Sequence, residues 1–265
     1  QTIEDEFGFP VLIRGKGGVR LTENGRALLP AIREILNAND HMDQIVANIR
    51  GMSFGRLRIG TFASASVLWL PKIIEEFSHD YPGIQIEIIV GGNDSLISQL
   101  DESCIDFAIM SNPPQGYEWI HLASDRMLVL LPPGHRLVDK DRVTLDEIDD
   151  DPFILSNEGF DYDVSQIIKG SGITPRLSFS TMENRGIIAM IQHGLGVTVM
   201  PEMVLDSLES NVITKELAPC EYRHMGIIVK SVNTASLAAK TFISYAKRII
   251  SELGTYPPID GELNA

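Results

Sequence analysis

One long stretch of the chain, residues 22–50, spaces its apolar residues as a dimerising helix does. They are separated mostly by steps of four and three residues, and they are Leu28, Ile32, Ile35, Met42, Val46 and Ile49. This spacing fits the a and d positions of a heptad repeat, with the polar Asn39 at one a position, where a single Asn sets register and partner number. Thr22 is suited to cap the helix. We therefore expect a rod of roughly 40 Å that pairs with a second copy of itself.

A short cationic hairpin precedes this helix. Residues 11–13 and 19–21 fit two strands, and the glycine-rich residues 15–18 fit their turn. Arg14, Lys16 and Arg20 place three cations on this element. A phosphate-binding loop is disfavoured because no Ser or Thr follows the Lys. A wing that touches DNA phosphate is the better interpretation, and it favours a dimerising helix over one that packs only on its own domain.

The remaining sequence alternates strand and helix patterns in two successive units. The first unit predicts strands at residues 57–62, 84–90, 105–110 and 127–131, with helices at 67–79 and 94–102. The second predicts strands at 153–155, 177–180, 197–200, 212–216 and 225–229, with helices at 164–169, 183–193, 202–208 and 235–253. Such alternation indicates mostly parallel sheets with helices on both faces. We expect an α/β body of two lobes with a ligand cleft between them.

Composition and charge narrow the class of protein. The 265 residues allow two domains, and a 44% hydrophobic, 22% charged chain is typical of soluble globular proteins. No apolar run approaches the length of a membrane span. Cys104 and Cys220 lack metal or redox spacing, so we expect reduced, buried thiols in the cytoplasm. The net charge of −14 argues against a surface that coats nucleic acid, although a local basic tip stays compatible with it.

Motifs for catalysis are weak. The chain has no Gly-x-Ser-x-Gly string, and its six histidines show no ligand spacing. Ser244–Lys247 matches a bare Ser-x-x-Lys without partner motifs. Asp149–Asp151 fits a solvated turn better than a cation site. We therefore expect no enzyme activity, no cofactor and no metal site.

Polar turns follow several predicted strands. They lie at residues 62–66, 91–94, 111–112, 156–158 and 181–184. Hydroxyl and backbone N–H groups at helix N-termini can hold an anion or a polar head, although each residue alone also fits a helix cap or turn. Arg185, directly after the last of these segments, is the only nearby cation, and Glu158 and Glu183 argue against a simple carboxylate ligand.

Several segments, taken in order, resemble one known family. Phe7–Arg14 and Gly18–Gly25 closely resemble the end of the winged helix-turn-helix of LysR-type transcriptional regulators. Gly55–Gly60, Ile105–Ala108 and the Gly-Leu-Gly-Val string before Pro201 are similar to the body of that family. The resemblance implies a remnant of the DNA-binding domain at residues 1–21 and a dimerising linker helix at 22–50. It also implies a periplasmic-binding-protein-like effector domain at 56–265.

The resemblance also implies lobe boundaries and functional residues. The first lobe would comprise about 56–131 and 232–253, and the second about 132–231. The DNA contacts would come from Gln1, Thr2, Arg14, Lys16 and Arg20. The effector contacts would come from Ser64, Ala65, Ser66, Asn93, Ser111, Asn112, Ser156, Glu158, Glu183 and Met200. Most base-reading residues are expected upstream of Gln1, and a few more are expected to be missing after Ile3.

The sequence thus predicts a cytoplasmic transcription factor that binds promoter DNA and a small-molecule effector. It would act as a homodimer through Thr22–Arg50, or as a homotetramer, without contacting a membrane. Two alternatives stay open at this point. One is a cytoplasmic small-molecule-binding protein without DNA-binding activity, against which the cationic wing argues. The other is an enzyme that uses the same cleft, against which the lack of a nucleophile–base pair argues.

Overall fold

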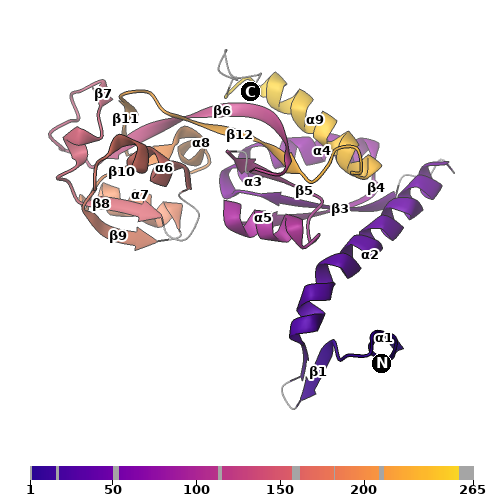
Figure 1. Ribbon diagram of the computed structural model, residues 1–265. Coiled ribbons are helices and arrows are strands. Elements are labelled where there is room, and N and C mark those ends of the chain that lie inside the picture. The colour runs from indigo at the N-terminus through magenta and orange to yellow at the C-terminus, as the bar shows by residue number, and fades with distance from the viewer. Residues whose placement is uncertain are drawn as a thin grey trace.

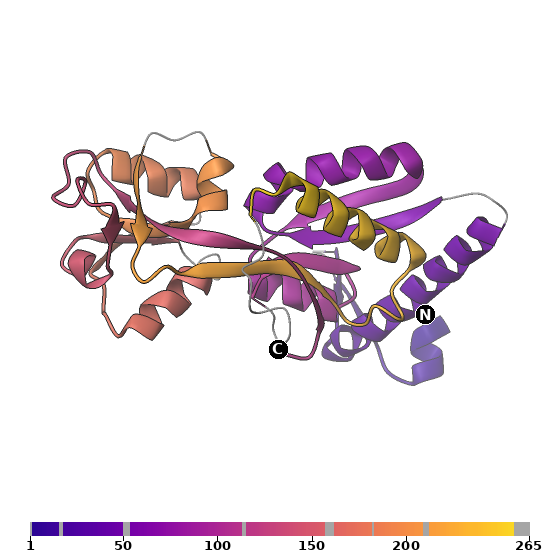
Figure 2. The same ribbon diagram turned by 90° about the horizontal axis from the view of Figure 1, so that it is seen from above.

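The chain forms an N-terminal arm and a body of two lobes that lie side by side (Figures 1 and 2). The structure is a computed structural model, and it describes residues 2–15, 18–49, 54–112, 115–156, 162–181, 183–208 and 212–256. Within these ranges, no helix has the length and apolar character needed to cross a membrane. The α/β class and the two-lobed architecture predicted above are confirmed.

The arm contains the predicted hairpin and long helix. A short helix α1 (Thr2–Phe7) precedes strands β1 (Leu12–Gly15) and β2 (Gly18–Leu21), which pair antiparallel. The predicted turn residues 16–17 lie outside the described residues. Helix α2 (Glu23–Ile49) follows, and the Thr22 hydroxyl accepts a hydrogen bond from the Gly25 backbone N–H at 2.9 Å. The predicted cap is therefore confirmed, and it fixes the start of α2 directly after the hairpin.

Helix α2 presents different chemistry on two faces. One face contacts the first lobe, where Arg33 pairs with Glu102 at 2.9 Å and the Asn37 amide donates to the Ser103 carbonyl at 3.1 Å. The other face carries the predicted heptad residues, listed here with their exposed fractions: Ile35 70%, Met42 55% and Val46 40%. A monomer thus leaves the apolar stripe of α2 in solvent.

The first lobe is a mixed sheet covered on both faces. Its strands are, in sheet order, β4 (Gly83–Val90), β3 (Phe54–Thr61), β5 (Phe107–Ser111), β12 (Tyr222–Val229) and the first part of β6 (Glu118–Leu131). Ile109 and Ile227 pack toward helices α4 (Leu70–Asp80) and α9 (Leu237–Leu253), whereas their neighbours Ala108 and Ile228 pack toward α5 (Asn93–Asp101). This alternation is the two-residue period of a strand buried on both faces.

The second lobe packs around the other end of β6. There β6 lies between β10 (Thr198–Pro201) and β11 (Ile213–Leu217), and β7 (Arg142–Val143) pairs with β11. Strands β8 (Phe153–Ser156) and β9 (Leu177–Thr181) pair in parallel. The helical segments are α6 (Tyr162–Ser171), α7 (Asn184–Gln192), α8 (Glu202–Asp206) and the 3-10 turn Asp146–Ile148.

Two long strands connect the lobes. Residues 118–126 of β6 pair with β12 in the first lobe, and residues 127–131 pair with β10 and β11 in the second. Strand β12 follows the second-lobe strand β11 in the sequence. It nevertheless pairs with β5 of the first lobe. Strand pairing therefore crosses the expected lobe boundaries near residues 131 and 231, and the domain limits stay a prediction.

The structure corrects three expectations. The sheet is mixed rather than mostly parallel, because β6 and β12 run antiparallel to their neighbours. The single helix expected at 67–79 is two helices, α3 (Ala63–Leu68) and α4, separated at Trp69. Pro71, in the first turn of α4, has no N–H to continue the hydrogen bonds of α3. Both cysteines are free, but Cys220 is exposed and Cys104 is only partly covered.

Replacing Phe77 tests the core of the first lobe. Its ring is fully buried, with the rings of Tyr81 and Phe242 at 5.0 and 5.1 Å between centroids. Phe77→Ala should lower the free energy of unfolding by about 3–5 kcal/mol because it leaves a cavity. Urea unfolding measures this, with Val67→Ala at an exposed position of α3 as control. Equal losses for the two variants would contradict the assignment.

Candidate functional site

Polar groups meet where the first lobe faces helix α6 of the second. The Ser111 hydroxyl, at the end of β5, donates to Asp163 Oδ2 at 2.9 Å, and Asn112 Nδ2 donates to Asp163 Oδ1 at 2.6 Å. Asn93, at the start of α5, supports this corner because its side-chain N–H donates to the Ser111 carbonyl at 2.9 Å. Asn112 has a φ of 53°, a left-handed conformation that Asn tolerates better than most residues. The carboxylate of Asp163 thus bridges the lobes.

A buried ion pair lies beside this corner, on the two crossing strands. Arg223 of β12 donates through Nε to Asp125 Oδ2 of β6 at 2.8 Å, and its Nη2 lies 2.7 Å from the same oxygen. The guanidinium also lies over the Phe62 ring at 4.9 Å and reaches the Ser64 hydroxyl at 3.4 Å. Asp125 Oδ1 accepts from the Met203 N–H of α8 at 3.1 Å. The pair therefore joins both crossing strands to α3 and to α8.

Burial changes the acidity of both carboxyl groups. It raises the pKa of Asp125, and the charge of Arg223 with the Met203 N–H opposes the shift. Burial likewise raises the pKa of Asp163, opposed by the charge of Arg223 and by the hydrogen bonds from Ser111 and Asn112. Each carboxylate is thus stabilised by its neighbours less than it is penalised by leaving water.

Two histidines lie on the same crossing strands. The Ser124 hydroxyl of β6 is 3.3 Å from His121 Nε2 and 3.1 Å from His224 Nδ1. The Asn112 N–H also donates to the His224 carbonyl at 2.8 Å. These contacts tie the end of β5 to β12, so the corner that holds Asp163 has little freedom to shift alone.

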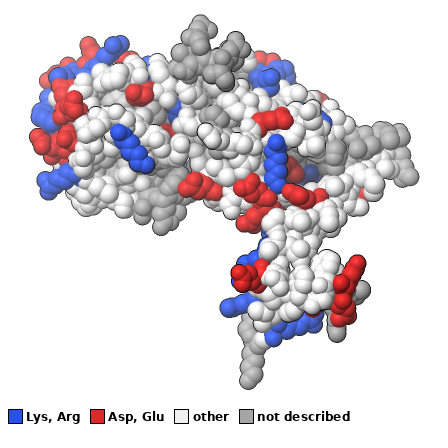
Figure 3. All heavy atoms as spheres, in the orientation of Figure 1, with Lys and Arg blue, Asp and Glu red and all other residues white. Residues whose placement is uncertain are grey.

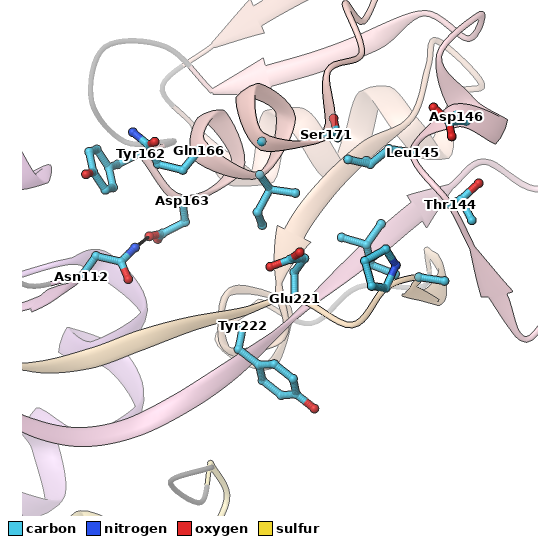
Figure 4. A pocket seen from close by; sticks show the side chains of 15 residues that line it. Asn112, Thr144, Leu145, Asp146, Tyr162, Asp163, Gln166, Ser171, Glu221 and Tyr222 are labelled. Carbon is cyan, nitrogen blue, oxygen red and sulfur yellow. Dashed lines mark hydrogen bonds between the residues drawn. The ribbon is translucent and has the colours of Figure 1, made fainter. Parts of the chain in front are cut away.

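A pocket of about 710 Å³ opens next to Asp163 (Figure 4). Its volume is in the range of small-molecule sites. Helix α6 forms one wall, and the segment between β11 and β12 forms another. The residues that line it are Asn112, Thr144, Leu145, Asp146, Tyr162, Asp163, Gln166, Ile167, Gly170, Ser171, Leu217, Ala218, Pro219, Glu221 and Tyr222.

The structure brings together only some of the predicted effector residues. Ser64, Asn93, Ser111 and Asn112 converge around Asp163 and Arg223. Ser64, Ala65 and Ser66 lie within α3 rather than in a turn before a helix, and Ser66 bonds to the Ala63 carbonyl.

Other predicted residues lie elsewhere. Ala65 and Met200 are buried in hydrophobic clusters of the first and second lobes, and Ser156 is buried at the end of β8. Glu183 is exposed and caps α7 by accepting from the Arg185 N–H at 3.3 Å. Glu158 lies outside the described residues.

Sequence reasoning missed the charged residues at the centre. Asp125, Asp163 and Arg223 were not predicted, and the named cation, Arg185, is exposed on α7. A signal for two of them required longer strands, because the expected strands began at residues 127 and 225, whereas β6 and β12 include Asp125 and Arg223. Opposite charges in two buried strands favour a pair between them. Asp163 has no such signal, since α6 is an ordinary amphipathic helix.

The predicted DNA contacts lie on the arm. Arg14 and Arg20 are exposed on β1 and β2, at the end of the molecule where Figure 3 shows both basic and acidic side chains. Gln1 and Lys16 lie outside the described residues, and the side chain of Thr2 is not described. In the described ranges, no group of three or more His, Cys, Asp or Glu is arranged to hold a metal ion.

Comparison with known proteins identifies the family. A family model described as the LysR substrate binding domain matches residues 50–250. The chain belongs to the LysR-type transcriptional regulators. The regulator YvbU of Bacillus subtilis is 34% identical to this LysR-type chain over 250 residues, which cover 93% of the chain and 86% of YvbU. YvbU is named as an HTH-type transcriptional regulator.

Solved structures share the LysR-type fold. A full-length OxyR variant from Pseudomonas aeruginosa superimposes with a TM-score of 0.73 at 20% identity, over 93% of this chain and 85% of that one. The effector binding domain of QuiR in complex with shikimate gives 0.68 at 19% identity, over 76% of this chain and 99% of that one. Both matches therefore show that this chain has the fold of these solved structures.

Removing Arg223 tests the buried pair of this LysR-type domain. Arg223→Met should lower the free energy of unfolding by about 3–5 kcal/mol because Asp125 is left buried and unpaired. The pKa of Asp125 should rise further, so the folded state holds the proton more tightly than the unfolded state. The loss should therefore grow as the pH rises from about 5 to about 7.5.

The matched control is Arg126→Met, one residue from Asp125. Arg126 pairs with Glu202 at 2.7 Å but is well exposed, so the variant should lose less than about 1 kcal/mol. Urea unfolding at both pH values measures the four differences. A loss of stability that does not depend on pH would show that the unpaired charge of Asp125 is not its cause.

Proposed function

We propose that this chain is a DNA-binding transcriptional regulator whose body binds a small-molecule effector between its lobes. The observation that carries the proposal is the pocket of about 710 Å³ beside the contact of Ser111 and Asn112 with Asp163. A ligand there touches groups from both lobes. It can therefore change how the lobes are arranged, which a ligand held by one lobe alone cannot do as directly.

The residues that bind the effector are, in this proposal, those around the pocket and the adjoining corner. Ser64, Asn93, Ser111 and Asn112 supply the first-lobe groups, together with Asp163 from the second. The site proposed here leaves out the predicted contacts that lie elsewhere, Ala65, Ser156, Glu183 and Met200. The QuiR domain, which has the same fold, is bound to shikimate, and this supports a small organic molecule as the ligand.

The effector acts by favouring one arrangement of the lobes. Strands β6 and β12 connect the lobes, and each lobe has its own hydrophobic cluster. In this proposal the angle between the lobes varies while each cluster stays packed. The ligand shifts this equilibrium only by the difference between its affinities for the two arrangements. The shift reaches the promoter because it alters how the arms of an assembled regulator are placed.

The arm supplies the DNA contacts and the subunit contacts in this proposal. Arg14, Lys16 and Arg20 bind DNA phosphate, and Gln1 and Thr2 contribute further DNA contacts. The apolar stripe at Ile35, Met42 and Val46 is the surface for a second copy of α2. A dimer then presents two wings to promoter DNA in the cytoplasm, and a dimer of dimers presents four.

Replacing a wing arginine tests the DNA contacts. In the full-length protein, Arg14→Ala or Arg20→Ala should weaken binding to specific and unrelated DNA by a similar factor, because phosphate contacts carry no sequence information. The dependence of affinity on salt should become shallower by about one ion for each removed charge. Fluorescence anisotropy at several salt concentrations measures both. A loss restricted to the specific site would place the residue at a base instead, and unchanged binding would favour an effector-binding protein that does not use this wing.

A charge in the apolar stripe tests the dimer. Met42→Asp should dissociate the dimer, because a carboxylate buried between two copies of α2 loses its water without gaining a partner. Ala27→Asp is the matched control, since Ala27 is exposed on the same helix and lies outside the a and d positions. Light scattering gives the mass of each variant. A dimer that survives Met42→Asp as well as it survives Ala27→Asp would refute the pairing through this stripe.

A further inference from the structure

The first-lobe groups suited to hold an anionic ligand are already engaged. The Ser111 hydroxyl and the Asn112 amide both donate to the carboxylate of Asp163, at 2.9 and 2.6 Å. The protein thus places its own carboxylate where an acidic ligand would otherwise find its hydrogen-bond donors. An acidic ligand must displace Asp163 or approach it against charge repulsion.

The charge of the adjoining cluster is also unbalanced. Its buried guanidinium, Arg223, is paired with Asp125 at 2.7 Å. Counting Asp125, Asp163 and Arg223 together gives two negative charges and one positive charge. The pair with Asp125 holds Arg223 on the crossing strands, and the charges of Arg223 and His224 lower the pKa of Asp163 without outweighing the effect of its burial.

The pocket itself adds negative rather than positive groups. Figure 4 shows Asp163 extending from α6 toward Asn112, and Glu221 extending into the same space from the segment before β12. Among the described residues that line the pocket, none is Lys or Arg. Leu145, Ile167 and Leu217 contribute apolar side chains to its walls, and Tyr162 contributes a ring at one end.

We propose that Asp163 determines the specificity of this pocket and selects an effector with a cationic amine on an apolar or aromatic body. The inference deepens the effector-binding function proposed above and depends on it. The amine donates to the Asp163 carboxylate, which Ser111 and Asn112 already hold in position, and the body lies along the apolar wall of the pocket. Glu221 adds attraction for the same charge. A carboxylate on the same body finds repulsion at both positions.

Three probes with one body and different heads test this selection. They are 2-phenylethylamine, phenylacetate and 2-phenylethanol, which carry a cation, an anion and a neutral hydroxyl group. Tyramine and agmatine extend the amine series. Thermal unfolding of the 265-residue chain is followed as each probe is titrated, because a ligand that binds the folded state raises the melting temperature by mass action. At least one amine should give a saturable rise, and phenylacetate should give none.

Two variants locate the effect. Asp163→Asn keeps a side chain that can form hydrogen bonds with Ser111 and Asn112 but removes the negative charge. Glu221→Gln removes the negative charge of Glu221. Asp163→Asn should weaken amine binding by roughly tenfold to a hundredfold, the usual range for a hydrogen bond to a charged group. Asp139→Asn, an exposed change on the second lobe, should leave amine binding unaltered.

Other outcomes overturn the inference. Saturable binding of phenylacetate in preference to the amines would show that the site takes acids after displacing Asp163, and the effector-binding function would still stand. Amine binding that Asp163→Asn and Asp139→Asn leave equally intact would place the amine elsewhere. The absence of a shift with every amine also rejects the assignment. DNA binding by the full-length protein is measured separately, so loss of the regulator function is distinguishable from loss of the amine assignment.

Discussion

The body depends most on the buried ion pair between Asp125 and Arg223. It lies where β6 and β12 pass from one lobe to the other, and it reaches α3 through Ser64 and α8 through the Met203 N–H. A buried ion pair adds little net stability compared with apolar residues of the same size, because both charges leave water. The ion pair instead restricts the geometry of the elements that it joins. A guanidinium fork meets a carboxylate in few geometries, so the pair specifies how the two strands, α3 and α8 come together.

The site follows from this constraint. Because the crossing strands are fixed at Asp125 and Arg223, the end of β5 at Ser111 and the neighbouring Asn112 face α6 across the lobe boundary. Asp163 then meets two donors from the first lobe, while Arg223 attracts it from a distance but stays paired with Asp125. The polar groups at this pocket therefore come from side chains that are distant in sequence.

Much of the fold was predictable from local pattern. The hairpin, the Thr22 cap, α2 and most strands and helices of the body follow from residue spacing, although residues 118–126 of β6 were not expected to form a strand. The resemblance of short motifs indicated the family. The local pattern did not indicate which strands pair with each other or which charged side chains meet. The direction of β6 and β12 in the sheet depends on contacts between segments about 100 residues apart, and so does the meeting of Asp125 with Arg223. The same limit explains why Ser111 and Asn112 were predicted as ligand-binding residues, whereas their partner, Asp163, was not.

The contacts of α2 have a mechanical consequence. The described ion pairs and hydrogen bonds from the middle of this helix to the body reach the first lobe, through Glu102, Ser103 and Lys230. Direct contacts therefore join the arm to the first lobe, so the two are expected to turn together. With a helix roughly 40 Å long, a turn of about 5° at the base displaces its far end by roughly 3.5 Å, comparable to the rise of one DNA base pair. In the proposed regulator, a small rotation of this unit is thus large enough, at the wing, to shift a contact with DNA phosphate.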